Sequence, residues 1–173
     1  MGKILTHLPV KLICGFIFKE NEILEKAKTI LKRKFGNLDF TSDILPFEHT
    51  DYYEKEFGQG LKRVFISFSR LIRPEGLFAI KITTNKIEDR LSFQGKRLIN
   101  IDPGYLDLAK LVLASTKDYK HRIYLNKGIF AEITLFYSGK SFHPWLWTYP
   151  DYQTNEYIEI FNAIRGIYER QIK

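Results

Sequence analysis

The chain has few of the residues that cross-link a fold or anchor it in a membrane. It contains one cysteine, Cys14, so no internal disulfide can form, and this usage is typical of a reducing cytosol. Cys14 lies inside the apolar run 10–18, which indicates a core position. No apolar stretch approaches the ~20 residues that a membrane-spanning helix needs, and no signal-peptide pattern opens the chain. We therefore expect a cytoplasmic protein with no membrane partner.

Common catalytic and metal-binding motifs are also missing. No histidine pairs with another His or Cys at the spacing of metal ligands, so we expect no metal site of the structural zinc type. There is no Gly-x-Ser-x-Gly nucleophile elbow. The segment Gly139-Lys140-Ser141 has the last residues of a phosphate loop, but Thr134 replaces the upstream glycine and a strand is expected to follow. We interpret this segment as a hairpin turn, and no cofactor is indicated.

Length and composition indicate one globular domain, residues 1–173. The chain has 45% hydrophobic and 27% charged residues and shows no repeat, low-complexity tract or linker. Its net charge of +7 is unevenly distributed, because residues 37–60 are acidic whereas residues 1–36 and 61–100 are basic. A basic balance is most often a solubility feature. Otherwise it favours an anionic partner, such as a nucleotide, a nucleic acid or a membrane surface.

Hydrophobic spacing in the first hundred residues predicts alternating strands and helices. The expected elements are a buried strand over 10–18, a helix from Asn21 to Gly36, a short strand in 38–47, a loop or short helix over 48–60, a strand over 63–71, a helix from Pro74 and a short strand over 97–101. The β-branched run 80–84 leaves a strand as the alternative to the second helix. This order is that of a ferredoxin-like fold, with the connectivity βαββαβ.

The last seventy residues predict an elaboration of this core. The apolar run 106–115 can be a helix or a strand, and we favour a helix. Strands are expected over 122–125 and 129–137 around the turn 126–128. A final helix is expected from about Thr154, with a stripe made of Tyr157, Phe161, Ile164 and Tyr168. The predicted class is therefore α+β, with a ferredoxin-like core and a C-terminal β-hairpin plus helix.

Polar and aromatic residues are concentrated in segments that a packed core does not require. Asp102-Pro103-Gly104 is expected to be a turn that precedes Tyr105, because Pro fixes φ and Gly accepts positive φ. Lys117–Arg122 is a compact charged group that contains His121. Asp151 follows the aromatic segment 145–149. In a predicted strand, Glu132 is an isolated carboxylate that either faces solvent, the commoner case, or lines a site.

We hypothesise that these segments converge on one cleft. Lys117 and Arg122 would bind an anion, since Arg can grip two oxygens at once. Asp102 or Asp151 would hold a hydroxyl group or a metal ion, and His121 would be the acid–base group. The candidate catalytic residues are therefore His121 and Asp102, and the candidate ligand-binding residues are Lys117, Arg122, Tyr105, Glu132 and Asp151. The competing interpretation is that the acidic residues and tyrosines only fix turns.

The strand over 63–68 partly matches an RNA-recognition strand, although it lacks the glycine of that motif. Arg63 and Phe65 would project from the face opposite the two helices, where a base could stack. We expect the C-terminal part of the chain to cover that face.

The whole chain resembles a family of uncharacterised prokaryotic proteins, a domain of unknown function of about this length. The resemblance rests mainly on Asn100-Ile101-Asp102-Pro103-Gly104-Tyr105, on His121-Arg122-Ile123-Tyr124 and on Trp147-Thr148-Tyr149-Pro150-Asp151-Tyr152. Some relatives bear the label "GTP-binding protein", but this chain has no phosphate loop. The resemblance therefore implies a family and not a mechanism.

Two classes of function remain. The first is a binder of, or an enzyme acting on, a small phosphorylated or nucleotide-like ligand. The second is a nucleic-acid or ribonucleoprotein-associated module. A third, simpler interpretation is an interaction scaffold without a ligand.

Overall fold

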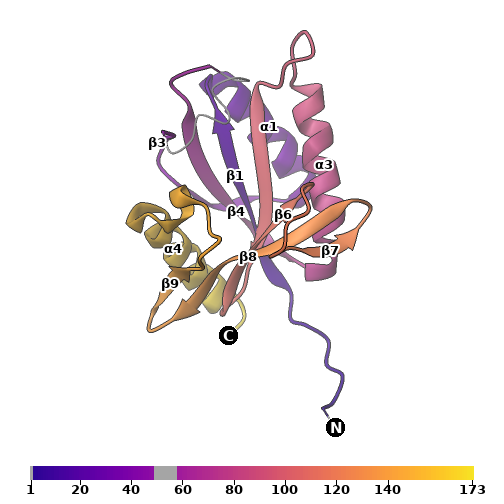
Figure 1. The fold of residues 1–173 in the computed structure, drawn as a ribbon, viewed down its shortest axis with the longest axis vertical. Coiled ribbons are helices and arrows are strands. Elements are labelled where there is room, and N and C mark those ends of the chain that lie inside the picture. The colour runs from indigo at the N-terminus through magenta and orange to yellow at the C-terminus, as the bar shows by residue number, and fades with distance from the viewer. Residues whose placement is uncertain (1, 49–57) are drawn as a thin grey trace.

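The structure, a computed structural model, describes residues 2–48 and 58–173, and its class is α+β (Figure 1). The strands form one open sheet and are β1 (Val10–Phe18), β2 (Leu38–Thr41), β3 (Leu45–Pro46), β4 (Lys62–Ile72), β5 (Ile99–Leu106), β6 (Lys110–Ser115), β7 (Ile123–Asn126), β8 (Ile129–Ser138) and β9 (Ser141–Pro144). The helices in the described residues are α1 (Asn21–Phe35), α3 (Leu77–Arg90) and α4 (Asn155–Gln171), with the short 3₁₀ turns η1 (Pro74–Gly76) and η2 (Pro150–Gln153).

The sheet is larger than the sequence predicts. Its strand order is β2-β4-β1-β5-β6-β8-β7, with β3 beside β4 and β9 beside β8, and every pairing is antiparallel. The expected C-terminal hairpin is therefore not a separate addition, because β6 to β9 continue the sheet that β1, β2, β4 and β5 begin.

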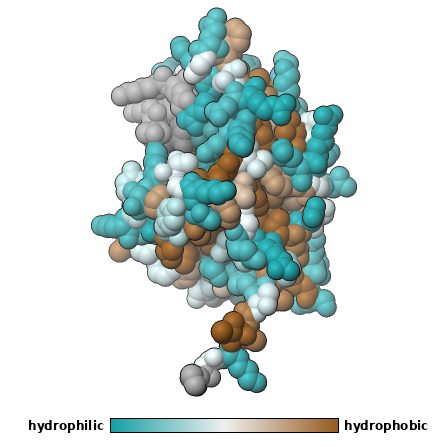
Figure 2. Space-filling model, turned by 90° about the vertical axis from the view of Figure 1, so that its right-hand side faces the viewer, coloured by the Kyte–Doolittle hydropathy of each residue, from teal (hydrophilic) through white to brown (hydrophobic). Residues whose placement is uncertain are grey.

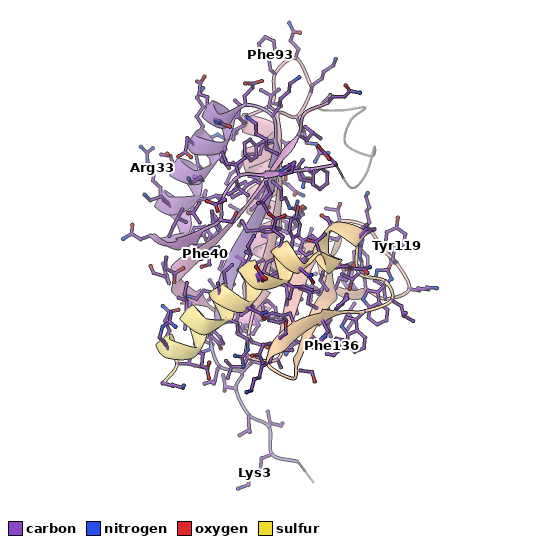
Figure 3. The ribbon with its side chains drawn as sticks, turned by 90° about the vertical axis from the view of Figure 1, so that its left-hand side faces the viewer. Lys3, Arg33, Phe40, Phe93, Tyr119 and Phe136 are labelled. Atoms are coloured by element: carbon purple, nitrogen blue, oxygen red, sulfur yellow. The ribbon has the colours of Figure 1, made fainter. Side chains whose placement is uncertain are left out.

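Both faces of the central strands are covered, which explains why β1 is buried along its whole length. Alternate residues of β1 and β4, such as Phe16 and Val64, pack against α1 and α3. The opposite residues, such as Ile13 and Phe65, pack against α4, which lies across the other face (Figure 3). The predicted alternation of β4 is confirmed. Because α4 covers Phe65, this ring cannot stack on a base.

A buried lysine fixes the end of α4 to the sheet. The Lys11 side chain is fully buried, and its Nζ donates hydrogen bonds to the Asp39 carboxylate at 2.6 Å, to the carbonyl of Phe68 at 3.1 Å and to the Gln171 side chain. A buried ammonium group is tolerated only when it is paired and hydrogen-bonded. Lys11 therefore has a structural role here.

Three of the four predicted helices are confirmed. Gly36 ends α1 with φ at 103°, a conformation that favours glycine. Pro74 starts η1, which continues as α3, and the stripe that begins with Leu77 and Ile80 is buried. The strand alternative for residues 80–84 is wrong. The side chain of Thr154 caps α4 by accepting a hydrogen bond from a backbone N–H.

Two predictions in the middle of the chain are wrong. Asp102-Pro103-Gly104 is not a turn, because it lies within β5, and residues 106–115 are not a helix, because most of them form β6. Residues 111–114 are continuously apolar because neighbouring residues point to opposite covered faces, with Leu111 toward α4 and Val112 toward α3. Pro103 is tolerated because the pairing of β5 with β6 begins only at the next residue.

The predicted strand in 38–47 is two short strands, β2 and β3, which both pair with β4. Of the expected loop or short helix over 48–60, residues 49–57 lie outside the described residues. The hairpin turns are confirmed, since Lys127 and Gly128 have positive φ, as do Gly139 and Lys140. The segment Gly139-Lys140-Ser141 therefore joins two strands.

The segment before β1, residues 2–9, extends away from the body and exposes Ile4 and Leu5 (Figure 2). Among the described residues, no helix combines the length and the hydropathy that a membrane span requires.

Gly104 is predicted to be essential for the contact between β5 and β6. A Cβ at this position would lie 2.4 Å from the carbonyl oxygen of Val112, which is a backbone atom and cannot rotate away. We expect Gly104→Ala to lower the free energy of unfolding by about 1–3 kcal/mol, measured by urea denaturation. Gly76→Ala is the matched control, because a Cβ added at Gly76 would have no neighbouring atom within 4 Å. Equal stability of the two variants would contradict this account.

Candidate functional site

The sheet divides between β5 and β6. These strands pair over only three positions, from Gly104 opposite Leu113 to Leu106 opposite Leu111. The first half of β5 continues to pair with β1, whereas β6 follows β8. Residues 99–103 therefore form an open strand edge inside the sheet, between α3 on one side and β6 on the other.

A cavity of about 730 Å³ opens beside this edge. Its walls come from α3, from β5, from β6 and the segment that follows it, and from the segment 149–152 that leads into α4. Its volume is within the range of about 300–1,000 Å³ that is usual for small-molecule sites. The charged residues that line it are Arg63, Lys81, Arg97, Lys117 and Arg122, and Glu88, Asp89, Asp102, Glu132 and Asp151.

Two charged side chains of α3 replace the missing strand partner. Lys81 Nζ donates a hydrogen bond to the carbonyl of Ile101 at 3.0 Å, and Glu88 Oε1 accepts one from the Ile101 N–H at 2.7 Å. Both side chains are buried. A buried backbone group without a partner costs about 1–3 kcal/mol, so these two bonds allow β5 to leave β6 without that penalty.

Glu88 also connects α3 to the segment that precedes β5. Its Oε2 accepts a hydrogen bond from Arg97 at 3.0 Å. Burial raises the pKa of Glu88, although Lys81, the Ile101 N–H and Arg97 act against this effect. The carboxylate therefore stabilises the open edge in spite of its own desolvation.

At the floor of the cavity lies a fully buried arginine. Arg63 donates a hydrogen bond to the hydroxyl of Tyr152 at 2.7 Å, and its guanidinium lies 3.4 Å from Asp102 and 3.7 Å from Asp151. The ring of Phe65 packs against it, with 4.8 Å from the guanidinium carbon to the ring centroid. Burial alone lowers the pKa of Arg63, but the surrounding hydroxyl and carboxylate groups outweigh it and raise the pKa. Arg63 thus holds the two carboxylates in place as a permanent cation.

Asp102 is the carboxylate best placed to meet a ligand. Its Oδ2 accepts a hydrogen bond from Asn100 at 2.8 Å, and Lys81 Nζ lies 3.8 Å from Oδ1, beyond hydrogen-bond distance. The side chain is 25% exposed. Oδ1 therefore remains available to accept a hydrogen bond from a hydroxyl or amine group in the cavity.

Arg122 organises the opposite wall. Its guanidinium donates hydrogen bonds to Glu132 at 2.8 Å, to Ser115 and the carbonyl of Lys117 at 2.9 Å each, and to the hydroxyl of Tyr149 at 3.2 Å. With this number of partners, Arg122 fixes the segment that follows β6. Glu132 is buried, so the expectation that it faces solvent is wrong.

His121 lies behind this wall and not in the cavity. Its Nε2 is 3.1 Å from Glu132 Oε2, and its ring stacks between Tyr119 and Trp147. Nδ1 is buried and has no hydrogen-bond partner among the described residues. His121 therefore does not line the cavity itself, but it contacts two residues that do, Glu132 and Tyr119.

The structure brings five of the predicted site residues to one cavity: Asp102, Lys117, Arg122, Glu132 and Asp151. Tyr105 is not among the lining residues, because its side chain packs against the cluster that contains Leu77 and Val112. The functional roles of the five remain predictions.

Sequence reasoning missed the contribution of α3. Lys81, Asn85 and Glu88 follow a spacing of four and three residues, which places them on one side of a helix. This polar stripe adjoins the apolar stripe of the same helix. A polar stripe beside a buried apolar one was the sequence signal that could have placed α3 at the cavity. Arg63 was assigned to the correct face of β4 but not to the cavity.

The cavity carries both signs of charge in equal number. Its five cationic and five anionic side chains are largely joined in pairs, such as Arg97 with Glu88 and Arg122 with Glu132. No group of three or more metal-ligating side chains occurs within residues 2–48 and 58–173. Burial raises the pKa of the Cys14 thiol, which is therefore no nucleophile.

Lys81 is predicted to stabilise the divided sheet. Lys81→Met leaves the Ile101 carbonyl without its donor, so we expect a loss of about 1–3 kcal/mol in the free energy of unfolding. The control is Lys86→Met, since Lys86 is exposed on the same helix. A loss of the same size in both variants, measured by urea denaturation, would refute the assigned role.

Glu88 is predicted to make stability depend on pH. Because its pKa is higher in the folded than in the unfolded chain, the folded state binds more protons, and stability falls as the pH rises from the ordinary pKa of a Glu through the raised value. We expect the stability of the natural protein relative to Glu88→Gln to be lower at pH 7 than at pH 4. Glu75→Gln, at an exposed position, should show no such trend. An opposite slope would mean that the ion pairs outweigh desolvation.

A comparison with protein-family models gives a match, whereas the other comparisons do not. No curated protein and no solved structure matches this chain. A family model described as Domain of unknown function (DUF4416) matches residues 8–168. This match covers the sheet, α1, α3, most of α4 and the residues that line the cavity. The chain therefore belongs to the family described as Domain of unknown function (DUF4416).

Proposed function

We propose that this protein binds, or acts on, a small phosphorylated or nucleotide-like ligand in the cavity between β5 and β6. The observation that carries this proposal is the cavity itself, with a volume of about 730 Å³ and polar groups that converge from four separate segments.

The wall chemistry supports a ligand that has several kinds of group. Asp102 offers a carboxylate oxygen to a hydroxyl group. Tyr149 is half-exposed at the cavity, and its hydroxyl is held by Arg122, so its ring is in a fixed position for a planar group to stack on. Arg97 and Lys117 are the cationic lining residues that reach solvent, and they suit an anionic group at the rim.

The balanced charge of the walls favours a ligand of low net charge. Most of the cations already neutralise carboxylates, so a triphosphate would bring negative charge that the cavity does not offset. A single phosphate at the rim fits better. We therefore expect no preference for GTP over ATP and no GTPase activity.

In an enzyme of this type, Asp102 would be the group that exchanges a proton with the ligand. Its oxygen meets the cavity directly, whereas His121 is separated from it by Glu132. Glu132 and Arg122 would then keep the opposite wall rigid.

We also infer that β1, α1, β2, β4, α3 and β5 form a ferredoxin-like unit in a cytoplasmic protein. The strand order β2-β4-β1-β5 and the packing of both helices on one face support the first part. The single buried cysteine supports the second.

The proposal predicts stabilisation by a nucleotide or a sugar phosphate. Native mass spectrometry of freshly purified protein would show a co-purified ligand, and a thermal-shift panel of nucleosides, nucleotides and sugar phosphates would identify the class. A ligand at ~100 times its dissociation constant should stabilise the fold by ~2.7 kcal/mol. Asp102→Asn should remove this shift, whereas Asp118→Asn, an exposed carboxylate outside the cavity, should retain it.

Asp102→Asn also changes the surroundings of Arg63, so a second pair of variants is needed. Lys117→Gln at the rim should weaken binding of the phosphorylated ligand, whereas Lys120→Gln should not. If no small anion shifts the melting temperature, and RNA binds with an affinity that falls steeply with salt, the nucleic-acid alternative is favoured instead.

A further inference from the structure

The turn Trp145-Leu146-Trp147 holds a large apolar surface in solvent. Leu146 is 103% exposed, and Trp145 and Trp147 are 37% and 38% exposed. These three residues follow β9 and lie outside the cavity.

Hydrogen bonds prevent this turn from folding back. Thr148 is buried and accepts a bond at its Oγ1 from the N–H of Trp145 at 2.8 Å, and the same hydroxyl donates to the carbonyl of Thr134 at 2.6 Å. The indole N–H of Trp147 donates to the carbonyl of Ile133 at 3.1 Å. These bonds fill the stretch of β8 between its pairings with β7 and β9. These hydrogen bonds therefore hold the turn in place, with Leu146 exposed to solvent.

Aromatic rings extend the apolar surface on both sides of the turn. Trp145 stacks on Trp147 at 5.1 Å, Trp147 on His121 at 5.6 Å and His121 on Tyr119 at 5.9 Å. Phe136 packs against Trp145 at the other end. The two end residues, Tyr119 and Phe136, lie on the same side of the molecule (Figure 3). Because the inner rings cover each other's faces, they present edges to solvent and leave little room for a nucleic-acid base to stack.

The surrounding charge is positive. Residues 110–149 contain six Lys or Arg and two Asp or Glu. Arg122 pairs with the buried Glu132 and Lys110 pairs with Asp107, so the other charged residues of this range are four lysines and Asp118. Lys120 directly precedes His121 in the stack, and Lys140 is exposed in the turn before β9. An apolar tip with a basic border is complementary to a surface that is apolar inside and anionic outside.

We propose that this turn docks the protein on an anionic lipid surface. Leu146 enters the boundary of the acyl chains, the two indoles lie at the level of the headgroups, and the lysines bind anionic headgroups. The expectation of no membrane partner rested on the lack of a spanning segment, and docking of this type requires none. Tyr119 belongs both to the ring stack and to the cavity rim, so docking brings the cavity mouth toward the lipid. The proposal does not depend on the nature of the cavity ligand.

The natural sequence provides a direct probe, because Trp145 and Trp147 are its only two tryptophans. Intrinsic fluorescence should shift to shorter wavelength when vesicles of phosphatidylglycerol and phosphatidylcholine in equal amounts are added. Bromine-labelled acyl chains should quench it. Vesicles of phosphatidylcholine alone should bind more weakly, and salt should reduce binding to the anionic vesicles.

Leu146→Ser should lower the partition coefficient about tenfold or more, which corresponds to 1.4 kcal/mol per factor of ten. Because the Leu146 side chain is fully exposed, the melting temperature of the Leu146→Ser variant should equal that of the natural protein. Phe93→Ser is the matched control, because Phe93 is 64% exposed on a different turn far from Tyr119 (Figure 3). This variant should bind vesicles like the natural protein.

Two results would overturn the proposal. One is the absence of both a spectral shift and co-sedimentation with anionic vesicles at low salt. The other is equal binding by Leu146→Ser and the natural protein. If single-stranded RNA instead quenches the tryptophans while vesicles have no effect, the surface recognises nucleic acid and the lipid proposal is wrong.

Discussion

The backbone N–H and carbonyl of Ile101 point toward β6 but form no hydrogen bonds with it. The rest of the site depends on the partners that these two groups find instead. Lys81 and Glu88 of α3 supply the two hydrogen bonds. Without these two bonds, the backbone groups of β5 would find hydrogen-bond partners only by pairing with β6 along the full length of the strand, and the space between the strands would close. The division of the sheet is thus a polar packing arrangement between a helix and a strand edge. It also explains two buried charges that a purely apolar core would exclude.

This arrangement makes the cavity polar without giving it a strong net charge. Each buried cation has carboxylate or carbonyl partners nearby, and Arg63 at the floor joins Asp102 to Asp151. Such a network keeps side chains in fixed positions, because a carboxylate that moves would leave a buried charge unpaired. The polar groups that line the cavity are therefore preorganised. This is the property that a selective binding site requires.

The C-terminal half of the chain has two separate surfaces. Arg122 and Glu132 support a wall of the cavity. Beyond them, His121 connects that wall to the stack of Trp147 and Trp145, which the turn exposes to solvent. Residues that are adjacent in sequence thus belong to two different surfaces, the polar wall of the cavity and the exposed apolar turn. Their mixed composition reflects this double role.

The sequence alone determined the elements with a strong local signal: the apolar β1, the alternation of β4, the stripe of α4 and the positive-φ hairpin turns. Local pattern also selected three of the segments that meet at the cavity, those of Asp102, Lys117–Arg122 and Asp151. It could not determine β6, because burial on two faces removes the periodicity that separates a strand from a helix. Nor could it show that Asp102-Pro103-Gly104 continues a strand, because this composition is also typical of turns. In the structure, the pairing of β5 with β6 begins at Gly104, and the absence of a side chain at Gly104 allows the two backbones to approach closely. The cavity, its α3 wall and the place of His121 behind Glu132 were decided only by tertiary structure, because each depends on contacts between residues far apart in the chain.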